Sequence, residues 1–303
     1  PRNSAAIKTL SGGGENGGNI ILGEGAYIAP LTVQEGNYAG IITGVGDFSK
    51  TGTGTLVLSG QNSYNGFTQI TGGTLRLDGG SERLPSGSLT ISSLATLDLN
   101  GCSQTIAYLG GNSGSKIQLG SGTCIINQGS MNGVIEGEGN LIKQSSFSLG
   151  LSRDNTYTGT TTVLGGTLNV TGSLTNNGSG KIFVAADRTD FIATISRTVG
   201  IDASYAGFGS TALGDDALGT AADLIDGVNT GTAKSLSMQW RLRNDDDLAA
   251  SLVSDVMNLS GMENDGIRTD QFTLLMSYSV DALPGGADAE AALAAAGKIQ
   301  LVW

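Results

Sequence analysis

The sequence QNSYNGFTQITGGTLRL at residues 61–77 recurs as DNTYTGTTTVLGGTLNV at residues 154–170. The two stretches align without gaps at a spacing of 93 residues, and the similarity extends back to residues 40 and 133. The shared residues Asn62, Tyr64, Gly66, Thr68, Gly72, Gly73, Thr74 and Leu75 recur as Asn155, Tyr157, Gly159, Thr161, Gly165, Gly166, Thr167 and Leu168. Repetition of this length predicts a stacked, elongated architecture rather than a globule built around a pocket.

Short apolar runs surround the two repeats. GTLVLSG, GTLRLDG and GTLNVTG place apolar residues at every second position and end on Gly. This period of two predicts strands with one buried face, and the turns come too soon for intervening helices. An antiparallel sandwich and a parallel β-solenoid with coils of about 20–25 residues both fit, and the long-range repeat favours the solenoid.

The length of the repeat gives two finer expectations. A unit of 93 residues would correspond to roughly four coils of a solenoid. ILGEG at residues 21–25 also resembles QLGSG at residues 118–122, at an offset of 97 residues. The larger offset predicts a small loop insertion near residues 27–31.

Composition supports a β-rich chain and excludes several other classes. Glycine contributes 49 of 303 residues without a three-residue period, which excludes collagen, and a hydrophobic content of 39% argues against disorder. Histidine is absent, which removes Ser-His-Asp and Cys-His nucleophile pairs and most zinc sites. We therefore expect no catalytic, cofactor or metal site.

Charge is distributed unevenly along the chain. Residues 1–178 carry 10 acidic and 8 basic side chains, a net charge of −2, whereas residues 179–303 carry 17 acidic and 8 basic, a net charge of −9. No basic patch is present, so nucleic acid and anionic membrane surfaces are not expected partners. No apolar run is long enough for a membrane span.

The pattern predicts three segments. Residues 1–18 are interpreted as a linker or a frayed N-terminal coil, residues 19–178 as a parallel β-helix, and residues 179–303 as an acidic, β-rich domain resembling a sandwich. In the last segment we expect strands at KIFVAA, FIATISRTV, SLSMQWRL and FTLLMSYSV, loop with one short helix over residues 202–232, and a helix at residues 288–297. Residues 245–259 fit helix or strand. The strand-like KIQLVW at the C-terminus, with no closing turn, predicts a chain truncated within a larger protein.

One long pattern carries a family resemblance. From Gly44 to Leu77 the sequence reads G-x-G-x-F-x-K-x-G-x-G-T-L-x-L-S-G-x-N-x-Y-x-G-x-T-x-I, followed by G-G-T-L-x-L, and a degenerate copy runs from Gly137 to Val170. This pattern resembles the autotransporter-associated β-strand repeat of bacterial secreted and surface proteins. The resemblance implies a right-handed parallel β-helix that is exported from the cell. It also implies that the chain belongs among proteins such as adhesins and passenger domains. Residues 236–280 more loosely resemble a C-terminal module of large repeat proteins from environmental bacteria.

Two cysteines and two tyrosines are candidate special positions. The sequence interval between Cys102 and Cys124 is close to the length expected of one coil, so they could form a disulfide across neighbouring coils or remain as two buried free thiols. Tyr64 and Tyr157 could contact glycan through their rings, or they could cover a coil edge while the neighbouring Asn residues occupy turns.

Carboxylates offer two further, weaker candidates. Asp215, Asp216 and the run at residues 245–247 could bind Ca²⁺ or form an exposed acidic loop, and no calcium-loop spacing is present. Glu136 and Glu138 are two positions apart, which would place them on the same face of one strand, as a polysaccharide-cleaving β-helix enzyme would require.

These observations favour a non-catalytic extracellular structural protein of the bacterial surface, used for display, adhesion or filament-like self-association. Its expected partners are copies of itself, bound head-to-tail or laterally, or other surface proteins. The first alternative is a carbohydrate-binding adhesin module with extracellular polysaccharide as its partner. The second is a polysaccharide-cleaving enzyme.

Overall fold

The structure, a computed structural model, describes residues 4–14, 18–172, 182–184, 193–199, 208–211, 221–229, 234–241, 256–262 and 272–277. Within these residues the chain is all-β, and none of them forms a helix that could cross a membrane. The chain divides into two compact units, one of residues 1–162 with 166–178 and one of residues 163–165 with 179–303.

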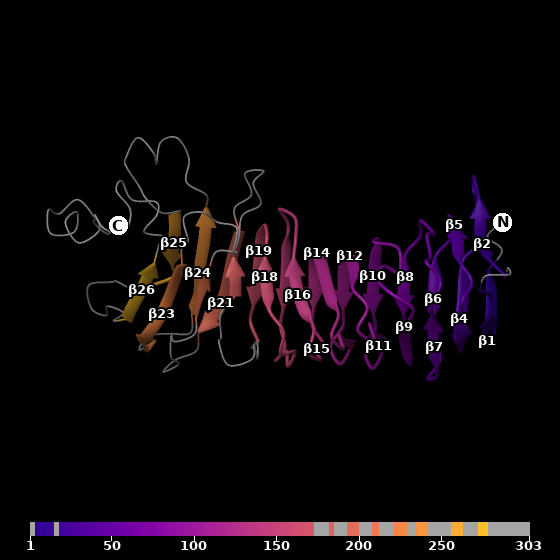
Figure 1. The fold of residues 1–303 in the computed structure, drawn as a ribbon, viewed down its shortest axis with the longest axis horizontal. Helices are drawn as coiled ribbons and strands as arrows, with labels where there is room; N and C mark the ends of the chain where they lie inside the picture. The colour runs from indigo at the N-terminus through magenta and orange to yellow at the C-terminus, as the bar shows by residue number, and fades with distance from the viewer. Residues whose placement is uncertain are drawn as a thin grey trace, which may run out of the picture. The chain divides into compact units, whose positions relative to one another are not determined.

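The first unit is a parallel β-solenoid of about eight turns, the arrangement that the long-range repeat favoured. Its strands follow one another along the stack in sequence order from the N-terminus (Figure 1). Each coil contributes segments to three columns of hydrogen-bonded parallel strands, which we call columns A, B and C. Neighbouring strands in such a column lie about 4.8 Å apart.

Column A contains the first halves of β1 (Ala5–Gly12) and β4 (Leu31–Tyr38), then β6 (Phe48–Lys50), β8 (Thr68–Ile70), β10 (Ser88–Ile91), the second halves of β12 (Gln104–Gly111) and β14 (Thr123–Met131), β17 (Ser148–Leu151) and β19 (Gly166–Val170). Column B contains the second halves of β1 and β4, then β7 (Thr55–Leu58), β9 (Thr74–Leu77), β11 (Thr96–Asp98), β13 (Lys116–Gln118) and β15 (Val134–Glu136).

Column C contains β2 (Ile20–Glu24), β5 (Ile42–Gly44), the first halves of β12 and β14, and β16 (Asn140–Lys143). β18 (Thr161–Val163) ends at the division between the two units. β3 (Tyr27–Ile28) forms a short antiparallel hairpin with β2, and this hairpin lies where the sequence offset predicted an inserted loop. Residues 5–12 pair in parallel with β4, so they belong to the stack.

The core is the space enclosed by the coils, and each column lines it with rows of mostly apolar inward side chains. In column B, Leu56, Leu75, Leu97, Ile117 and Ile135 follow one another in register and are fully buried. Stacking of this kind removes each aliphatic side chain from water, and burial of one such side chain stabilises the fold by about 1.5–3 kcal/mol. The alternation predicted from the sequence therefore separates core from surface.

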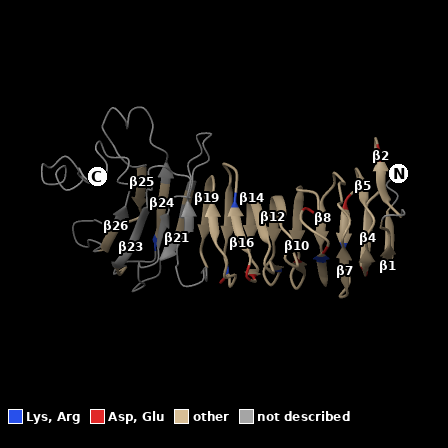
Figure 2. Cartoon of the chain, viewed as in Figure 1, with Lys and Arg blue, Asp and Glu red and all other residues tan. Residues whose placement is uncertain are grey.

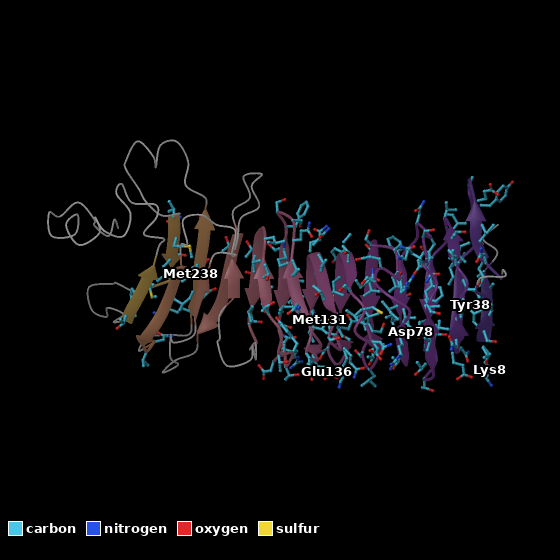
Figure 3. The ribbon with its side chains drawn as sticks, viewed as in Figure 1. Lys8, Tyr38, Asp78, Met131, Glu136 and Met238 are labelled. Atoms are coloured by element: carbon cyan, nitrogen blue, oxygen red, sulfur yellow. The ribbon has the colours of Figure 1, made fainter. Side chains whose placement is uncertain are left out.

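Space inside the coils is shared between neighbours. Gly111 and Met131 are partners in column A, and a Cβ added to Gly111 would lie 2.1 Å from the sulfur of Met131. The methionine side chain therefore fills the volume that the glycine leaves open. Figure 3 shows Met131 among the strands, whereas Glu136 lies at their edge.

The two repeats do not stack on the same column, and the expectation of four coils per repeat is wrong. Four turns of column A lead from Phe48 to Gly129 through Thr68, Leu89 and Leu109, yet the repeat partner of Phe48 is Leu141, which lies in column C. The second copy is therefore displaced by about four and two-thirds turns. The motif therefore starts in column A in the first copy and in column C in the second.

The second unit is described through seven strands: β20 (Ile182–Val184), β21 (Ala193–Val199), β22 (Phe208–Thr211), β23 (Ala221–Gly227), β24 (Lys234–Arg241), β25 (Val256–Ser260) and β26 (Phe272–Ser277). β24 lies antiparallel between β21 and β25, and β23 lies antiparallel between β22 and β26. β20 pairs in parallel with β22.

Four of these strands occupy the predicted runs, and β25 shows strand at residues 256–259, the described end of the stretch that fitted helix or strand. The loop predicted over residues 202–232 is wrong where it is described, because β22 and β23 pair there. The helix predicted at residues 288–297 lies outside the described residues. The packing of two sheets into a sandwich stays a prediction.

Candidate functional site

The shared Asn of the two repeats is buried in the coil and replaces a strand hydrogen bond. The N–H of Ile42 donates to Asn62 Oδ1 at 2.8 Å, and the N–H of Ile135 donates to Asn155 Oδ1 at 2.9 Å. Each amide nitrogen in turn donates to a carbonyl two positions before it, that of Gly60 or Arg153. Each Asn therefore ties its coil to the preceding one.

The shared Tyr is also internal, so in this structure neither Tyr64 nor Tyr157 is placed to contact glycan, which was one of the two alternatives considered from the sequence. The two residues are 1% and 0% exposed. Their hydroxyl groups hydrogen bond to Thr68 Oγ1 at 2.6 Å and Thr161 Oγ1 at 2.5 Å. Burial raises the pKa of both phenols well above the usual value, so both hydroxyl groups remain neutral inside the coil. A ring enclosed by its own coil cannot stack on a sugar.

The shared Lys occupies a core position. Lys50 follows Val33 and precedes Ile70 in the inward row of column A, and Lys143 follows Ile126 in column C; both are fully buried. Lys50 Nζ donates to the carbonyls of Thr51 and Gly72 at 2.7 and 2.9 Å, which joins two neighbouring coils.

The second lysine makes the same kind of contact. Lys143 Nζ donates to the carbonyls of Gln144 and Ser145 at 2.7 and 2.8 Å. Burial lowers the pKa of both lysines, that of Lys143 to about 8, while the nearby Glu35 opposes the shift at Lys50. Sequence reading recognised these lysines as part of the motif but missed their burial, because a Lys among polar residues gives no sign that its carbon chain points inward.

Cys102 and Cys124 are free and buried, so of the two alternatives considered from the sequence this structure contains the two thiols. The register explains the difference, because Cys124 pairs with Gln104 rather than with Cys102. The interval between the cysteines is therefore slightly longer than the local coil. Burial raises the pKa of the Cys124 thiol to about 12, which makes it an unreactive core side chain.

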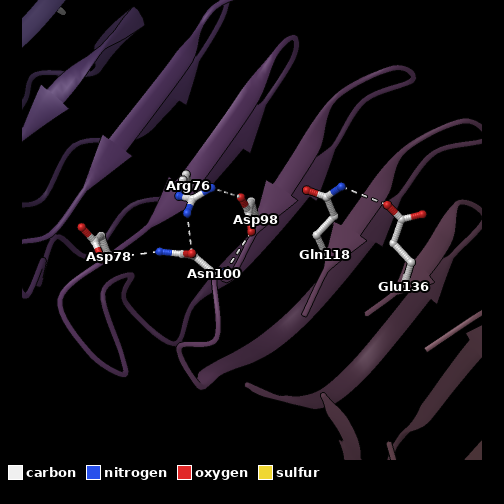
Figure 4. Close-up of polar contacts among 6 residues, drawn as sticks. All are labelled: Arg76, Asp78, Asp98, Asn100, Gln118 and Glu136. Atoms are coloured by element: carbon white, nitrogen blue, oxygen red, sulfur yellow. Dashed lines mark hydrogen bonds and ion pairs between the residues drawn. The ribbon is translucent and has the colours of Figure 1, made fainter. Parts of the chain in front are cut away.

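A hollow of about 540 Å³ lies on the outer side of column B. It is lined by Asp98, Asn100, Gly101, Gln118, Gly120, Ser121, Glu136 and Gly137. A ladder of polar side chains crosses it from coil to coil (Figure 4). Arg76 pairs with Asp98 at 3.1 Å and hydrogen bonds to Asn100, and Gln118 Nε2 donates to Glu136 Oε1 at 2.9 Å.

The carboxylates of this ladder are held by neighbours. Glu136 also pairs with Lys116 at 3.3 Å. Glu138 lies beyond β15, past Gly137 with its φ of +118°, so the prediction that Glu136 and Glu138 share a strand face is wrong. The arrangement offers hydrogen-bonding groups to a ligand in an open hollow, and it does not bring the two predicted carboxylates together as an acid and a base.

The acidic residues considered for Ca²⁺, Asp215, Asp216 and residues 245–247, lie outside the described residues. Among the residues that are described, no group of three or more His, Cys, Asp or Glu side chains could hold a metal ion.

Comparison with known proteins agrees with the repeat. The family model of the passenger-associated-transport-repeat matches residues 48–77 and residues 141–170. These are the two copies that the structure places in different columns of one solenoid. No solved structure matches the chain.

Two curated proteins are similar to about half of the chain. The Adhesin BmaC autotransporter of Brucella suis biovar 1 (strain 1330) is 36% identical over 164 residues, which is 51% of this chain and 5% of that protein. The Uncharacterized lipoprotein YdeK of Escherichia coli (strain K12) is 34% identical over 175 residues, 49% of this chain and 13% of that protein. The chain thus spans a small part of either relative. With two such repeats wound into a parallel β-solenoid, it is an autotransporter-associated β-helix repeat protein.

Proposed function

We propose that the chain is a non-catalytic scaffold of the bacterial cell surface, whose solenoid presents its outer faces for adhesion. The observation that carries this proposal is the location of the repeat's signature side chains. Asn62, Tyr64 and Lys50 and their counterparts are buried and bonded within the coils. The repeat therefore encodes the scaffold, and recognition falls to the outward residues between the signature positions.

Extracellular placement and adhesion are supported by similarity to a protein that is named as an adhesin and an autotransporter. A solenoid suits this role because each coil adds length while contacting its neighbours alone, so the surface grows without a larger core. Self-association, head-to-tail or lateral, is a second use of the same faces.

Adhesion is tested with beads coated with the purified chain and applied to cultured animal cells or to bacterial cells. The proposal expects attachment that requires the folded solenoid, so beads coated with the chain after heat denaturation serve as the control. Equal attachment by native and denatured coats would contradict it.

The two other functions have separate tests. Light scattering after size-exclusion chromatography measures self-association, and a monomer at every concentration would exclude it. Release of reducing ends from polysaccharides that is abolished in Glu136→Gln would replace the scaffold by the polysaccharide-cleaving alternative.

A further inference from the structure

Three aromatic side chains are exposed at one corner of the solenoid, where column C leads into column A. Phe67 is 63% exposed, Tyr108 46% and Phe147 59%. Phe67 immediately precedes β8, Tyr108 begins the column A half of β12, and Phe147 immediately precedes β17. We call these three residues the aromatic row.

The register places Phe67 and Tyr108 at the same strand position two coils apart, and it places Phe147 two coils further along but one position earlier, opposite Asn127. Ser88 is the partner of Tyr108, and the pairing of Thr68 with Leu89 places Phe67 opposite Ser88, so two coils separate Phe67 from Tyr108. On the other side, Tyr108 pairs with Gln128, and Gly129 pairs with Leu149 two positions after Phe147. Two coils correspond to about 10 Å along the axis.

The strand surface beside the row is polar and its outward side chains are uncharged, while Asp47 lies in the corner one coil before Phe67. Its outward positions in column A are Ser49, Gln69, Thr90, Gly110 and Ser130, which follow one another in register. A Cβ added to Gly110 would lie 3.8 Å from the ring of Tyr108, so the absence of a side chain there leaves the ring accessible from that side.

Column B differs in its outward positions. They include Arg76, Asp98, Lys116 and Glu136, which form ion pairs across the coils. Beside the aromatic row lies Asp47, whose Oδ1 accepts the N–H of Phe67 at 2.9 Å. Figure 2 shows how sparse charged residues are along the solenoid strands. A ligand of column A is therefore selected by shape and hydrogen bonding rather than by charge.

These features match one class of ligand. The C–H face of a sugar ring stacks on an aromatic ring, and Ser, Thr and Gln side chains supply donors and acceptors for its hydroxyl groups. An extended β-1,4-linked chain repeats its disaccharide at about the spacing of the aromatic row. We infer that the outer face of column A binds a neutral, extended polysaccharide lying along the solenoid axis, with Phe67, Tyr108 and Phe147 as stacking platforms.

A second copy of the chain fits this face less well. The core of a protein interface is a continuous apolar patch, whereas the rings here stand apart on a polar floor. The inference rests on the proposed adhesive role, for which it names the class of partner. It also moves glycan contact from the buried Tyr64 and Tyr157 to rings that a sugar can reach.

The test is affinity electrophoresis of the whole chain in gels that contain hydroxyethyl cellulose, a neutral β-1,4-glucan. Phe67→Ala combined with Tyr108→Ala should weaken retardation by roughly tenfold or more, as loss of central aromatic contacts does. The matched control is Tyr27→Ala, which removes a ring that is 74% exposed on the β2–β3 hairpin, and it should bind like the wild type. Circular dichroism should show both variants folded. Cellohexaose should compete more strongly than cellobiose, because the disaccharide reaches one platform.

Three results would overturn the inference. The first two are no retardation of the wild type, and a loss of retardation in Tyr27→Ala equal to that in the double variant. The third is a wild-type dimer that Tyr108→Ala dissociates, which would assign the face to a second copy. Bead attachment measured with the same variants separates this outcome from the scaffold proposal. Attachment that persists without glucan binding would remove the polysaccharide and leave the adhesive scaffold.

Discussion

The first repeat, residues 48–77, and the second, residues 141–170, have the same chemistry in different columns of the solenoid. Lys50 lies in column A and its counterpart Lys143 in column C, yet both are buried and both donate to backbone carbonyls at the following corner. The motif therefore specifies a local structure, a strand followed by a hydrogen-bonded corner, and not a position in the solenoid. The two copies differ in how well the residues at that corner fit its backbone conformation.

The corner after the lysine shows this difference. Gly52 has a φ of +67° in the first copy, and Ser145 has a φ of +76° at the equivalent place in the second. A side chain in this left-handed region is strained, whereas glycine is not. Ser145 Oγ donates to the carbonyl of Asn127 at 2.9 Å, which offsets part of that strain.

The largest loss of stability is expected when the buried Tyr of either copy is replaced, and comparing the two losses tests whether the copies are equivalent in the core. Tyr64→Ala and Tyr157→Ala each remove a buried ring and the partner of a Thr hydroxyl, and each should lower the free energy of unfolding by about 3–5 kcal/mol. Urea denaturation measures both. A loss at one copy alone would break the equivalence.

The buried lysines give the next effect. Lys50→Met and Lys143→Met keep the carbon chain but leave several carbonyls without a donor, which should cost about 1–3 kcal/mol each. Lys50→Met should lower the free energy of unfolding more than Lys143→Met does, because Glu35 also loses a positive neighbour. The exposed Lys116→Met removes a surface ion pair and should cost less than about 1 kcal/mol. If Lys143→Met lowered the free energy of unfolding by no more than the exposed Lys116→Met, the Lys143 ammonium group would not be hydrogen bonded in the coil.

The pH dependence of stability tests the lowered pKa of Lys143. The pKa of Lys143 is about 8 in the folded chain, below the ordinary 10.5 that it regains on unfolding. Between these values the unfolded chain holds a proton that the folded chain has released, so stability rises with pH.

From pH 8 to pH 9 the wild type should gain stability relative to Lys143→Met. The comparison with the variant cancels the opposite trend of Cys124, whose raised pKa makes the unfolded thiol ionise first at higher pH. A constant difference between the two proteins across this range would contradict the lowered pKa of Lys143.

The smallest effect is expected when the corner residue of one copy is replaced by that of the other. Ser145→Gly should relieve the left-handed strain and raise stability by about 0.5–1 kcal/mol, and Gly52→Ser should lower it by a similar amount. Thermal unfolding of both variants beside the wild type measures the pair. Destabilisation by Ser145→Gly would mean that the bond to Asn127 outweighs the strain.

Sequence reading predicted the solenoid, its short strands and the presence of two repeats, because alternation and turn glycines are local signals. It could not predict the column of each copy, which depends on the sum of many unequal coil lengths. The coil from Ala5 to Leu31, for example, is longer than the coil from Leu31 to Phe48. For the same reason it could not decide between a disulfide and two free thiols at Cys102 and Cys124, because the local coil is too short to bring them into register. Burial of Tyr64 was equally hidden, since a Tyr beside polar residues fits either face of a corner.

The exposed rings were missed for a related reason. Phe67 and Tyr108 are far apart in the sequence and share no motif, so their alignment emerges once the coils between them are counted. An interval close to two coils between exposed aromatics is the signal that could have found them.

The displacement of the second repeat is tested most directly by disulfide formation between neighbouring coils, in a chain in which Cys102 and Cys124 are replaced by Ser and Ala. The structure makes Ile125 and Ile142 partners in column C, with Cα atoms about 4.8 Å apart and so within disulfide range. Ile125→Cys with Ile142→Cys should cross-link on mild oxidation, and Ser130→Cys with Ile142→Cys should not. Cross-linking of the second pair and not the first would place β16 in column A and contradict the account.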